Sequence, residues 1–353
     1  DVERVEVNLA RVTAYTRAHG LAWRPHTKTH KTAQLAARQL AAGAQGLSVA
    51  TPLEAEVMAQ VSDDLLFAYP PVGEARLARL MALPARVRLG VALDSHEALA
   101  GLSRAAQEAG RGVGVLVELD LGMRRVGVQT PDEAVALARA IQALPALTYR
   151  GVAFYPGHIR ARTADQDAAL AHVSSSLHAF LQALCTAGLE PGVVSGGSTP
   201  TLWRSHEVAG LTELRAGINV LNDRNTALLG ACAWEEVAYS VLATVVSTAV
   251  PGQAVVDAGS KALAKEEPPV GTGYGAVLER PEVPVRALSE EHGLLDLTHS
   301  AWRPRVGERV RLVPNHVCAS VALHDALWAV QGSAVRERWE VAARGWTGQR
   351  PAV

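Results

Sequence analysis

The chain is poor in cysteine, in net charge and in long apolar runs, and each shortage excludes a class of protein. Its three cysteines, Cys185, Cys232 and Cys318, are odd in number and far apart, so they predict no disulfide framework and favour a reducing compartment. We expect Cys185 and Cys232 to be small buried hydrophobic residues. The 34 basic and 35 acidic residues nearly cancel, which argues against a nucleic-acid partner.

No segment has the composition of a membrane span or of an export signal. The longest apolar run, residues 237–250, is too short to span a bilayer and contains Ser and Thr. The N-terminus, Asp1-Val2-Glu3-Arg4, has neither the basic nor the apolar stretch of a signal peptide. We therefore expect a soluble, cytoplasmic protein without a membrane partner.

The first two thirds of the chain alternate between strand-like and helix-like segments. With 353 residues, of which 48% are hydrophobic, the chain can bury a large core. Strands are expected at residues 21–28, 46–50, 65–69, 87–93, 113–119, 149–155, 193–196 and 211–217, and helices at residues 2–19, 31–42, 52–61, 74–82, 95–109, 131–144 and 164–187. Eight such units predict a TIM-like (β/α)8 barrel, with a doubly wound sheet as the alternative.

The pattern changes near Trp234, where short β-rich runs separated by Gly, Pro and charged turns replace the long helical periods. These runs cover residues 237–250, 254–257, 283–288, 294–297 and 309–313. They predict a mostly β second domain. We place the two domains at residues 1–230 and 231–353.

The octapeptide RPHTKTHK, residues 24–31, concentrates cationic and titratable groups at the end of the first expected strand. Because side chains alternate along a strand, Arg24, His26, Lys28 and His30 are expected to share one side. Such a face suits neither a core nor open solvent, and it favours an anionic guest that needs a lysine. For His30, contact with neighbouring backbone is an equally good interpretation.

Active sites of such barrels lie at the C-terminal ends of the strands. In this chain those ends are polar or rich in glycine: Lys28, residues 118–127, residues 155–158, residues 195–199 and residues 215–219. The run Gly196-Gly197-Ser198-Thr199 can direct backbone N–H and hydroxyl groups at a phosphate. A lysine and a phosphate cradle on one rim indicate pyridoxal phosphate held as a Schiff base.

These residues also carry a family resemblance over roughly residues 5–323. The octapeptide resembles the signature of the D-serine dehydratase and D-threonine aldolase family, which belongs to the alanine-racemase-like pyridoxal-phosphate enzymes. The run Gly122-Met123-Arg124-Arg125-Val126-Gly127 is similar to the arginine motif of alanine racemases. Further runs that resemble family motifs are residues 155–158, 257–261, 290–293 and 314–318.

The resemblance implies roles for individual residues. Lys28 would carry the cofactor and act in catalysis, Arg125 would approach the ring hydroxyl, and Tyr155 and His158 would lie near the ring. The phosphate would be held by Gly197, Ser198, Thr199 and the turn formed by Gly217, Ile218 and Asn219. A homodimer is also implied, as is a short segment before Asp1.

His316 and Cys318, in the β-rich part, form a candidate metal-binding pair. On a strand, residues two apart share a face, and imidazole with thiolate suits Zn²⁺. Taken alone, such a pair is more often a coincidence. The resemblance implies instead a divalent metal at His316 and Cys318, with Zn²⁺ favoured over Mn²⁺, Mg²⁺ or Co²⁺.

The resemblance implies a lyase for D-3-hydroxy amino acids. A cysteine at position 318 favours a dehydratase that releases a 2-oxo acid and ammonia. The alternative is an aldolase that cleaves the substrate to glycine and an aldehyde. Two further alternatives are an amino-acid racemase, with Tyr274 as a candidate second base, and a non-enzymatic pyridoxal-phosphate carrier.

Overall fold

The computed structural model describes residues 1–345 and divides into two compact units. Among the described residues, the barrel unit comprises Ala10–Ile159, Thr163–Gly217 and residues 342–345. The β unit comprises Asp1–Leu9, Arg160–Arg162 and Ile218–Val341. The predicted domain boundary near residue 230 stays a prediction.

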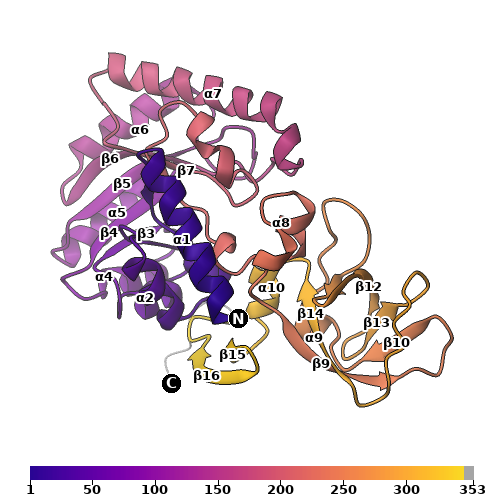
Figure 1. The fold of residues 1–353 in the computed structure, drawn as a ribbon. Helices are drawn as coiled ribbons and strands as arrows, with labels where there is room; N and C mark the ends of the chain where they lie inside the picture. Colours follow the sequence, from indigo (N-terminus) through magenta and orange to yellow (C-terminus); the bar gives the residue numbers. More distant parts are fainter. Residues whose placement is uncertain (346–353) are drawn as a thin grey trace. The chain divides into compact units, whose positions relative to one another are not determined.

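The barrel unit is built on an eight-stranded parallel sheet (Figure 1). Its strands are β1 (Ala22–Trp23), β2 (Leu47–Val49), β3 (Asp64–Phe67), β4 (Arg88–Leu93), β5 (Val113–Leu119), β6 (Leu147–Phe154), β7 (Val193–Gly196) and β8 (Glu213–Leu214). Their spatial order is β1-β8-β7-β6-β5-β4-β3-β2. The outermost strands, β1 and β2, meet at an isolated bridge between His26 and Ser48, where the Ser48 N–H donates to the Pro25 carbonyl at 2.9 Å. The TIM-like architecture predicted from the alternation is confirmed.

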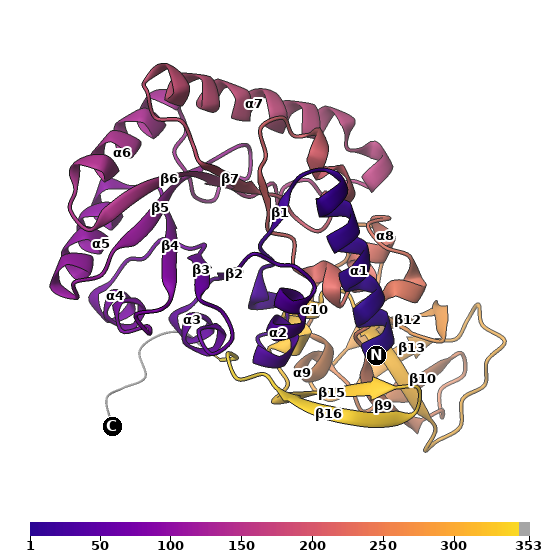
Figure 2. The same ribbon diagram turned by 60° about the vertical axis from the view of Figure 1, so that its left-hand side comes forward.

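Helices cover the outside of this sheet (Figure 2). They are α1 (Val2–Ala18), α2 (Ala33–Ala41), α3 (Pro52–Met58), α4 (Glu74–Met81), α5 (His96–Glu108), α6 (Pro131–Ala143) and α7 (Asp167–Thr186). Several begin at a side-chain cap, because a hydroxyl accepts an N–H that the first turn leaves unpaired. At α6, Thr130 and Glu133 form a reciprocal capping box followed by Pro131. These local signals explain why the helix positions were readable from the sequence.

A layer of leucine and alanine side chains fills part of the interior of the barrel. Leu66, Ala92, Leu116 and Ala153, one from each of β3 to β6, form a buried layer across the interior. Ala92 also lines a cavity at the C-terminal ends of the strands. The alanine occupies little volume, so space remains above this layer for a guest.

The β unit is centred on a closed antiparallel barrel in the order β10-β13-β12-β11-β14-β9. Its strands are β9 (Val241–Ser247), β10 (Gln253–Val256), β11 (Gly275–Val277), β12 (Arg280–Leu288), β13 (Gly293–Asp296) and β14 (Arg309–Pro314). A hairpin, β15 (Ala326–Gln331) and β16 (Ala334–Glu340), and the short helices α8 (Arg224–Leu228), α9 (Ser260–Leu263) and α10 (Val317–Val321) complete it. The predicted mostly β second domain is confirmed, although β11 and the hairpin were not predicted.

The exposure of the cysteines differs from the expectation at one position. Cys232 is buried, as predicted, but Cys185 is exposed. The buried residues of α7 include Leu184, so the next residue along the helix points away from the core.

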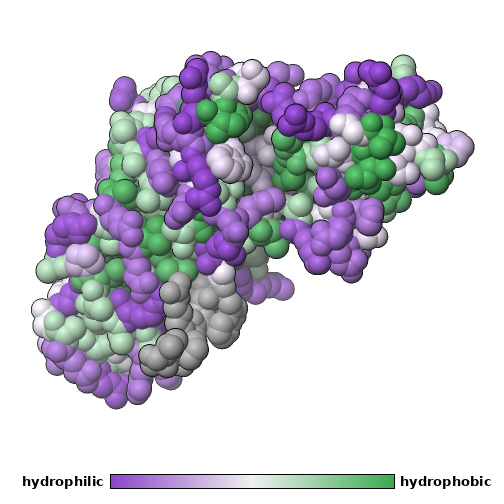
Figure 3. All heavy atoms as spheres, turned by 90° about the horizontal axis from the view of Figure 1, so that it is seen from below, coloured by the Kyte–Doolittle hydropathy of each residue, from purple (hydrophilic) through white to green (hydrophobic). Residues whose placement is uncertain are grey.

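Polar and apolar side chains are interspersed over much of the face drawn in Figure 3. Within residues 1–345, no helix is both long enough and apolar enough to cross a membrane.

Gly151 provides a test of this packing, because β6 bends there and brings its backbone against β7. Its φ is +140°, and a Cβ added to it would lie 2.0 Å from the Val193 carbonyl oxygen. We expect Gly151→Ala to lower the free energy of unfolding by about 1–3 kcal/mol through overpacking and backbone strain. Urea unfolding followed by tryptophan fluorescence measures this. Gly112→Ala is the matched control, since a Cβ there meets no atom within 4 Å; equal midpoints for the two variants would contradict the prediction.

Candidate active site

Lys28 lies on a short 3-10 helix, Thr27–Thr29, which follows the first strand after residues 24–26. His26 caps this turn, since its Nδ1 accepts the backbone N–H of Lys28 at 3.4 Å. The Thr27 hydroxyl donates to the Ser48 carbonyl at 3.1 Å, which ties the turn to β2. Lys31 follows with a φ of +56° and pairs with the buried Glu54 of α3. These contacts place Lys28 at the C-terminal rim of the sheet.

The expectation that four residues of the octapeptide share one strand face is wrong. The strand β1 ends at Trp23, so the alternation does not extend to Lys28. Arg24 forms ion pairs with Asp64 at 2.6 Å and Glu213 at 2.7 Å. These two residues begin strands β3 and β8, so Arg24 points toward the N-terminal end of the sheet, away from the rim where Lys28 lies.

His30 is buried, and its Nε2 lies 3.1 Å from Gln39 Oε1. Burial lowers the pKa of His30 to about 4, so it is neutral at physiological pH. The sequence left open whether His30 has a functional role or a structural one, and these contacts favour the structural role.

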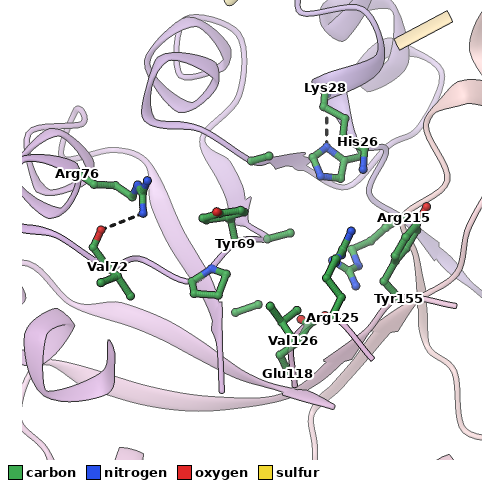
Figure 4. A pocket seen from close by; sticks show the side chains of 14 residues that line it. His26, Lys28, Tyr69, Val72, Arg76, Glu118, Arg125, Val126, Tyr155 and Arg215 are labelled. Carbon is green, nitrogen blue, oxygen red and sulfur yellow. Dashed lines mark hydrogen bonds between the residues drawn. The ribbon is translucent and has the colours of Figure 1, made fainter. Parts of the chain in front are cut away.

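A cavity of about 500 Å³ opens beside Lys28, within the range of small-molecule sites. Its polar lining consists of His26, Lys28, Tyr69, Arg76, Glu118, Arg125, Tyr155 and Arg215. Figure 4 shows these side chains distributed around the cavity, with Lys28 and His26 together and with Arg125, Tyr155 and Arg215 together. Lys28, Arg125 and Tyr155 are therefore brought to one place from the ends of three different strands.

Tyr155 lies near both Lys28 and Arg125. The Lys28 Nζ is 5.4 Å from the centroid of the Tyr155 ring, and the Arg125 guanidinium carbon is 5.0 Å from the same centroid. At these distances a cation is attracted by the face of the ring. Among residues 1–345, no carboxylate forms an ion pair with the Lys28 amine.

Glu118 and Arg215 are two cavity residues that the sequence interpretation did not select. Burial raises the pKa of Glu118, although the positive charges of Arg215 and Arg125 act in the opposite direction. One Arg215 amino group donates to the Phe154 carbonyl at 2.6 Å, while its buried Nε has no partner within the described chain. Both residues stand at strand ends, and that position was the available signal.

The cavity carries an excess of positive charge. Lys28, Arg76, Arg125 and Arg215 face a single carboxylate, Glu118. Burial lowers the pKa of His26 well below its usual range, and the positive charges of Lys28 and Arg215 add to this effect. His26 is therefore neutral, and the cationic excess suits an anionic guest.

Five other predicted residues of the barrel unit lie outside the lining of this cavity. His158 packs against Gly122, and its buried Nδ1 has no partner in the described residues. Gly197 has a φ of +89°, and the Ser198 hydroxyl lies 3.0 Å from that of Thr201. Thr199 is buried, and Gly217 packs against the backbone of His26.

The loops after β7 and β8 adjoin, because the Arg215 N–H donates to the Gly196 carbonyl at 2.8 Å. Ile218 and Asn219 belong to the β unit. The side-chain amide of Asn219 is buried, and neither its nitrogen nor its oxygen has a partner among the described residues. An amide in this state retains its capacity to bind a polar group.

His316 and Cys318 are not on a strand, so the geometric argument for the pair was wrong. His316 is the N-cap of helix α10, and Cys318 is in its first turn. The strand β14 ends at Pro314, and the chain turns into the helix at His316. The two side chains are nevertheless neighbours, joined by a hydrogen bond.

The His316 ring also contacts Asp223, which the sequence interpretation did not select. Its Nδ1 lies 3.3 Å from Asp223 Oδ2. Burial alone would lower the pKa of His316, but Cys318 and Asp223 raise it to about 11. Within residues 1–345, no three His, Cys, Asp or Glu side chains are arranged to hold a metal ion.

The residues around Lys28 and the His316–Cys318 pair can be compared with what pyridoxal phosphate and a divalent metal ion, respectively, would require. The unpartnered Arg215 Nε, the Lys28 amine and the cationic lining provide what an aromatic aldehyde with a phosphate requires. Imidazole and thiolate side by side provide one borderline nitrogen donor and one soft sulfur donor, which suits a metal ion such as Zn²⁺ that keeps open coordination positions.

Comparison with known proteins gives matches over nearly the whole chain. Residues 1–224 match the family model for the alanine racemase N-terminal domain, and residues 238–330 match that for a putative serine dehydratase domain. A D-threonine aldolase from Arthrobacter sp. is 32% identical over 98% of this chain and 92% of its own. A D-threo-3-hydroxyaspartate dehydratase from Delftia sp. is 33% identical over 98% of this chain and 96% of its own.

Solved structures agree with these matches. The crystal structure of D-threonine aldolase from Filomicrobium marinum superposes with a TM-score of 0.89 at 32% identity, over 98% of this chain and 94% of that one. A cysteine-to-alanine variant of the hydroxyaspartate dehydratase has been solved in a metal-free form, and it superposes with a TM-score of 0.87 at 32% identity, over 98% of this chain and 96% of that one. Together with the eight-stranded parallel sheet and the β-rich second part, these matches show that the chain belongs to the D-threonine aldolase and D-serine dehydratase family of lyases, whose N-terminal part has the alanine-racemase fold.

Proposed function

We propose that this protein is a pyridoxal-phosphate- and divalent-metal-dependent lyase for D-3-hydroxy amino acids, acting as a dehydratase that yields a 2-oxo acid and ammonia. The observation that carries the proposal is the Lys28 amine in a cationic cavity beside Tyr155, Arg125 and Arg215. The hydroxyaspartate dehydratase among the relatives supports the reaction type.

The proposed cofactor contacts come from loops at the strand ends. Lys28 would join the cofactor covalently, Arg125 and Tyr155 would contact its ring, and His158 would lie near it. The phosphate would be held by Gly197, Ser198, Thr199, Gly217, Ile218 and Asn219. Arg215, with its unpartnered Nε, is a further proposed contact. When bound, pyridoxal phosphate acts as an electron sink that makes the substrate α-proton acidic.

The chain's own residues then have separate tasks. The Lys28 amine, once released from the cofactor, accepts the α-proton as a general base. The cationic lining holds the substrate carboxylate and the phosphate in place. A divalent ion held by His316 and Cys318 would provide a Lewis acid for the poor hydroxide leaving group. We further propose that the protein acts as a cytoplasmic homodimer.

An aldolase is the second candidate function, because a D-threonine aldolase is among the relatives of comparable identity. Cleavage between Cα and Cβ needs the same lysine, cofactor and metal ion, and it releases glycine and an aldehyde. The cysteine at position 318 is the residue on which we base the choice of dehydratase. The solved alanine racemase from Clostridium difficile is 13% identical, and it supports the fold alone.

The covalent role of Lys28 can be tested by trapping. We expect borohydride reduction of the cofactor-loaded protein to attach the cofactor to the peptide that contains Lys28, which mass spectrometry detects. Lys28→Ala is expected to show no label and to lose activity by at least about a thousandfold, because covalent catalysis and proton transfer both depend on this amine.

Lys261→Ala is the matched control for this experiment, since Lys261 is an exposed lysine paired with Glu291. It should be labelled like the unmodified protein. Label on any lysine other than Lys28 would overturn the assignment.

The reaction type can be tested by product analysis. Incubation with D-serine, D-threonine and D-threo-3-hydroxyaspartate is expected to release 2-oxo acid and ammonia in equal amounts. EDTA is expected to abolish this release, and added Zn²⁺ to restore it, because hydroxide leaves poorly without a Lewis acid. Glycine as the main product would favour the aldolase, and full activity after chelation would remove the metal from the reaction.

A further inference from the structure

Asp223 is a fully buried carboxylate whose two oxygens serve two different elements of the β unit. Its Oδ1 accepts the backbone N–H of Thr226 at 2.8 Å and lies 3.0 Å from the Thr226 hydroxyl. Asp223 thereby caps the N-terminus of α8. Its Oδ2 accepts the backbone N–H of Val317 at 3.0 Å and lies 3.3 Å from His316 Nδ1. One carboxylate therefore fixes the start of α8 and the start of α10 together.

The residues next to Asp223 add to this connection. The Arg224 side chain donates to Asn315 Oδ1 at 2.9 Å, and the Asn225 N–H donates to the Asn315 carbonyl at 3.1 Å. Farther along α10, the Ser320 hydroxyl donates to the Ala262 carbonyl at 2.6 Å. The backbone on both sides of His316 is thus held in place, and on its Nδ1 side the ring is oriented by its contact with Asp223.

Capping of α8 uses Oδ1 and does not explain why Oδ2 faces both the Val317 N–H and the His316 ring. A cap for α8 needs only one oxygen acceptor, whereas burying a full charge is unfavourable unless each oxygen has partners. The second oxygen faces a ring whose side chain is 27% exposed, while the Asp223 side chain is wholly buried. The imidazole is therefore anchored on its buried edge.

We propose that Asp223 is a positioning residue for a metal ligand: it accepts the Nδ1–H of His316, fixes that tautomer, and leaves the Nε2 lone pair for a divalent cation beside Cys318. A carboxylate on the far nitrogen of a ligating histidine orients the ring and makes it a better donor. This inference rests on the metal site of the proposed function.

The test measures metal binding directly, without using turnover. Co²⁺ is titrated into the metal-free full-length protein, and the thiolate-to-cobalt charge-transfer absorbance reports ligation by Cys318. We expect Asp223→Asn to weaken Co²⁺ affinity by about 10–100-fold, the usual effect of losing such a partner. Thr226→Ala is the matched control, because it removes a contact to Oδ1 and leaves both contacts to Oδ2. It should bind Co²⁺ within about threefold of the unmodified protein while lowering thermal stability, because it removes the Thr226 half of the capping box at the start of α8.

A second measurement uses the unmodified protein and so does not depend on a variant that folds. Histidine ring ¹⁵N spectra of the Zn²⁺-loaded protein are expected to show His316 protonated at Nδ1 and ligated through Nε2. Ligation through Nδ1, or equal Co²⁺ affinity in Asp223→Asn, would overturn the positioning role while leaving the metal site intact. Absence of the charge-transfer band in the unmodified protein would instead overturn the metal site itself, and this inference with it.

Discussion

The contact between the end of the first strand and β2 determines where the Lys28 amine lies. Strand β1 has only two residues, and the ring of strands is joined at this point by the single bridge between His26 and Ser48. The Thr27 hydroxyl and the His26 ring then hold the turn that carries Lys28. Because these bonds involve backbone groups on both sides, the lysine is fixed at the C-terminal rim, where parallel strands present their ends.

The electrostatics of the cavity follow from this placement. Three arginines and a lysine meet one buried carboxylate, and the neighbouring histidine is neutral. Of these cations Arg215 is buried, and its Nε has no partner within the described residues, which is unfavourable in the absence of a guest. The same groups are ready to stabilise anionic groups without reorganisation when a guest enters. The features that make the cavity unfavourable when it is empty are therefore those that suit it to a phosphorylated aldehyde and an amino acid.

Sequence periodicity was sufficient for most of the fold. The strand β7 and the starts of α3 and α6 were predicted at their observed residues, because apolar runs, proline at the first helical turn and threonine caps are local signals. The strand β11 and the hairpin β15–β16 were missed. The predicted pairing of His316 with Cys318 on a strand was wrong because β14 ends at Pro314. Where a strand ends depends on contacts with distant residues, here with Asp223.

By itself, the sequence determined the alternating architecture, the β-rich second part, the family and the choice of Lys28 as the residue to examine. These follow from local composition and from motifs, which a linear chain displays. Only the tertiary structure separated Arg24 and His30 from Lys28, brought Glu118 and Arg215 to the cavity, and placed Asp223 against His316. The physical reason is that ion pairs and hydrogen bonds between distant residues, such as Arg24 and Glu213, which are 189 positions apart, are set by how the strands assemble and leave no local pattern in the chain.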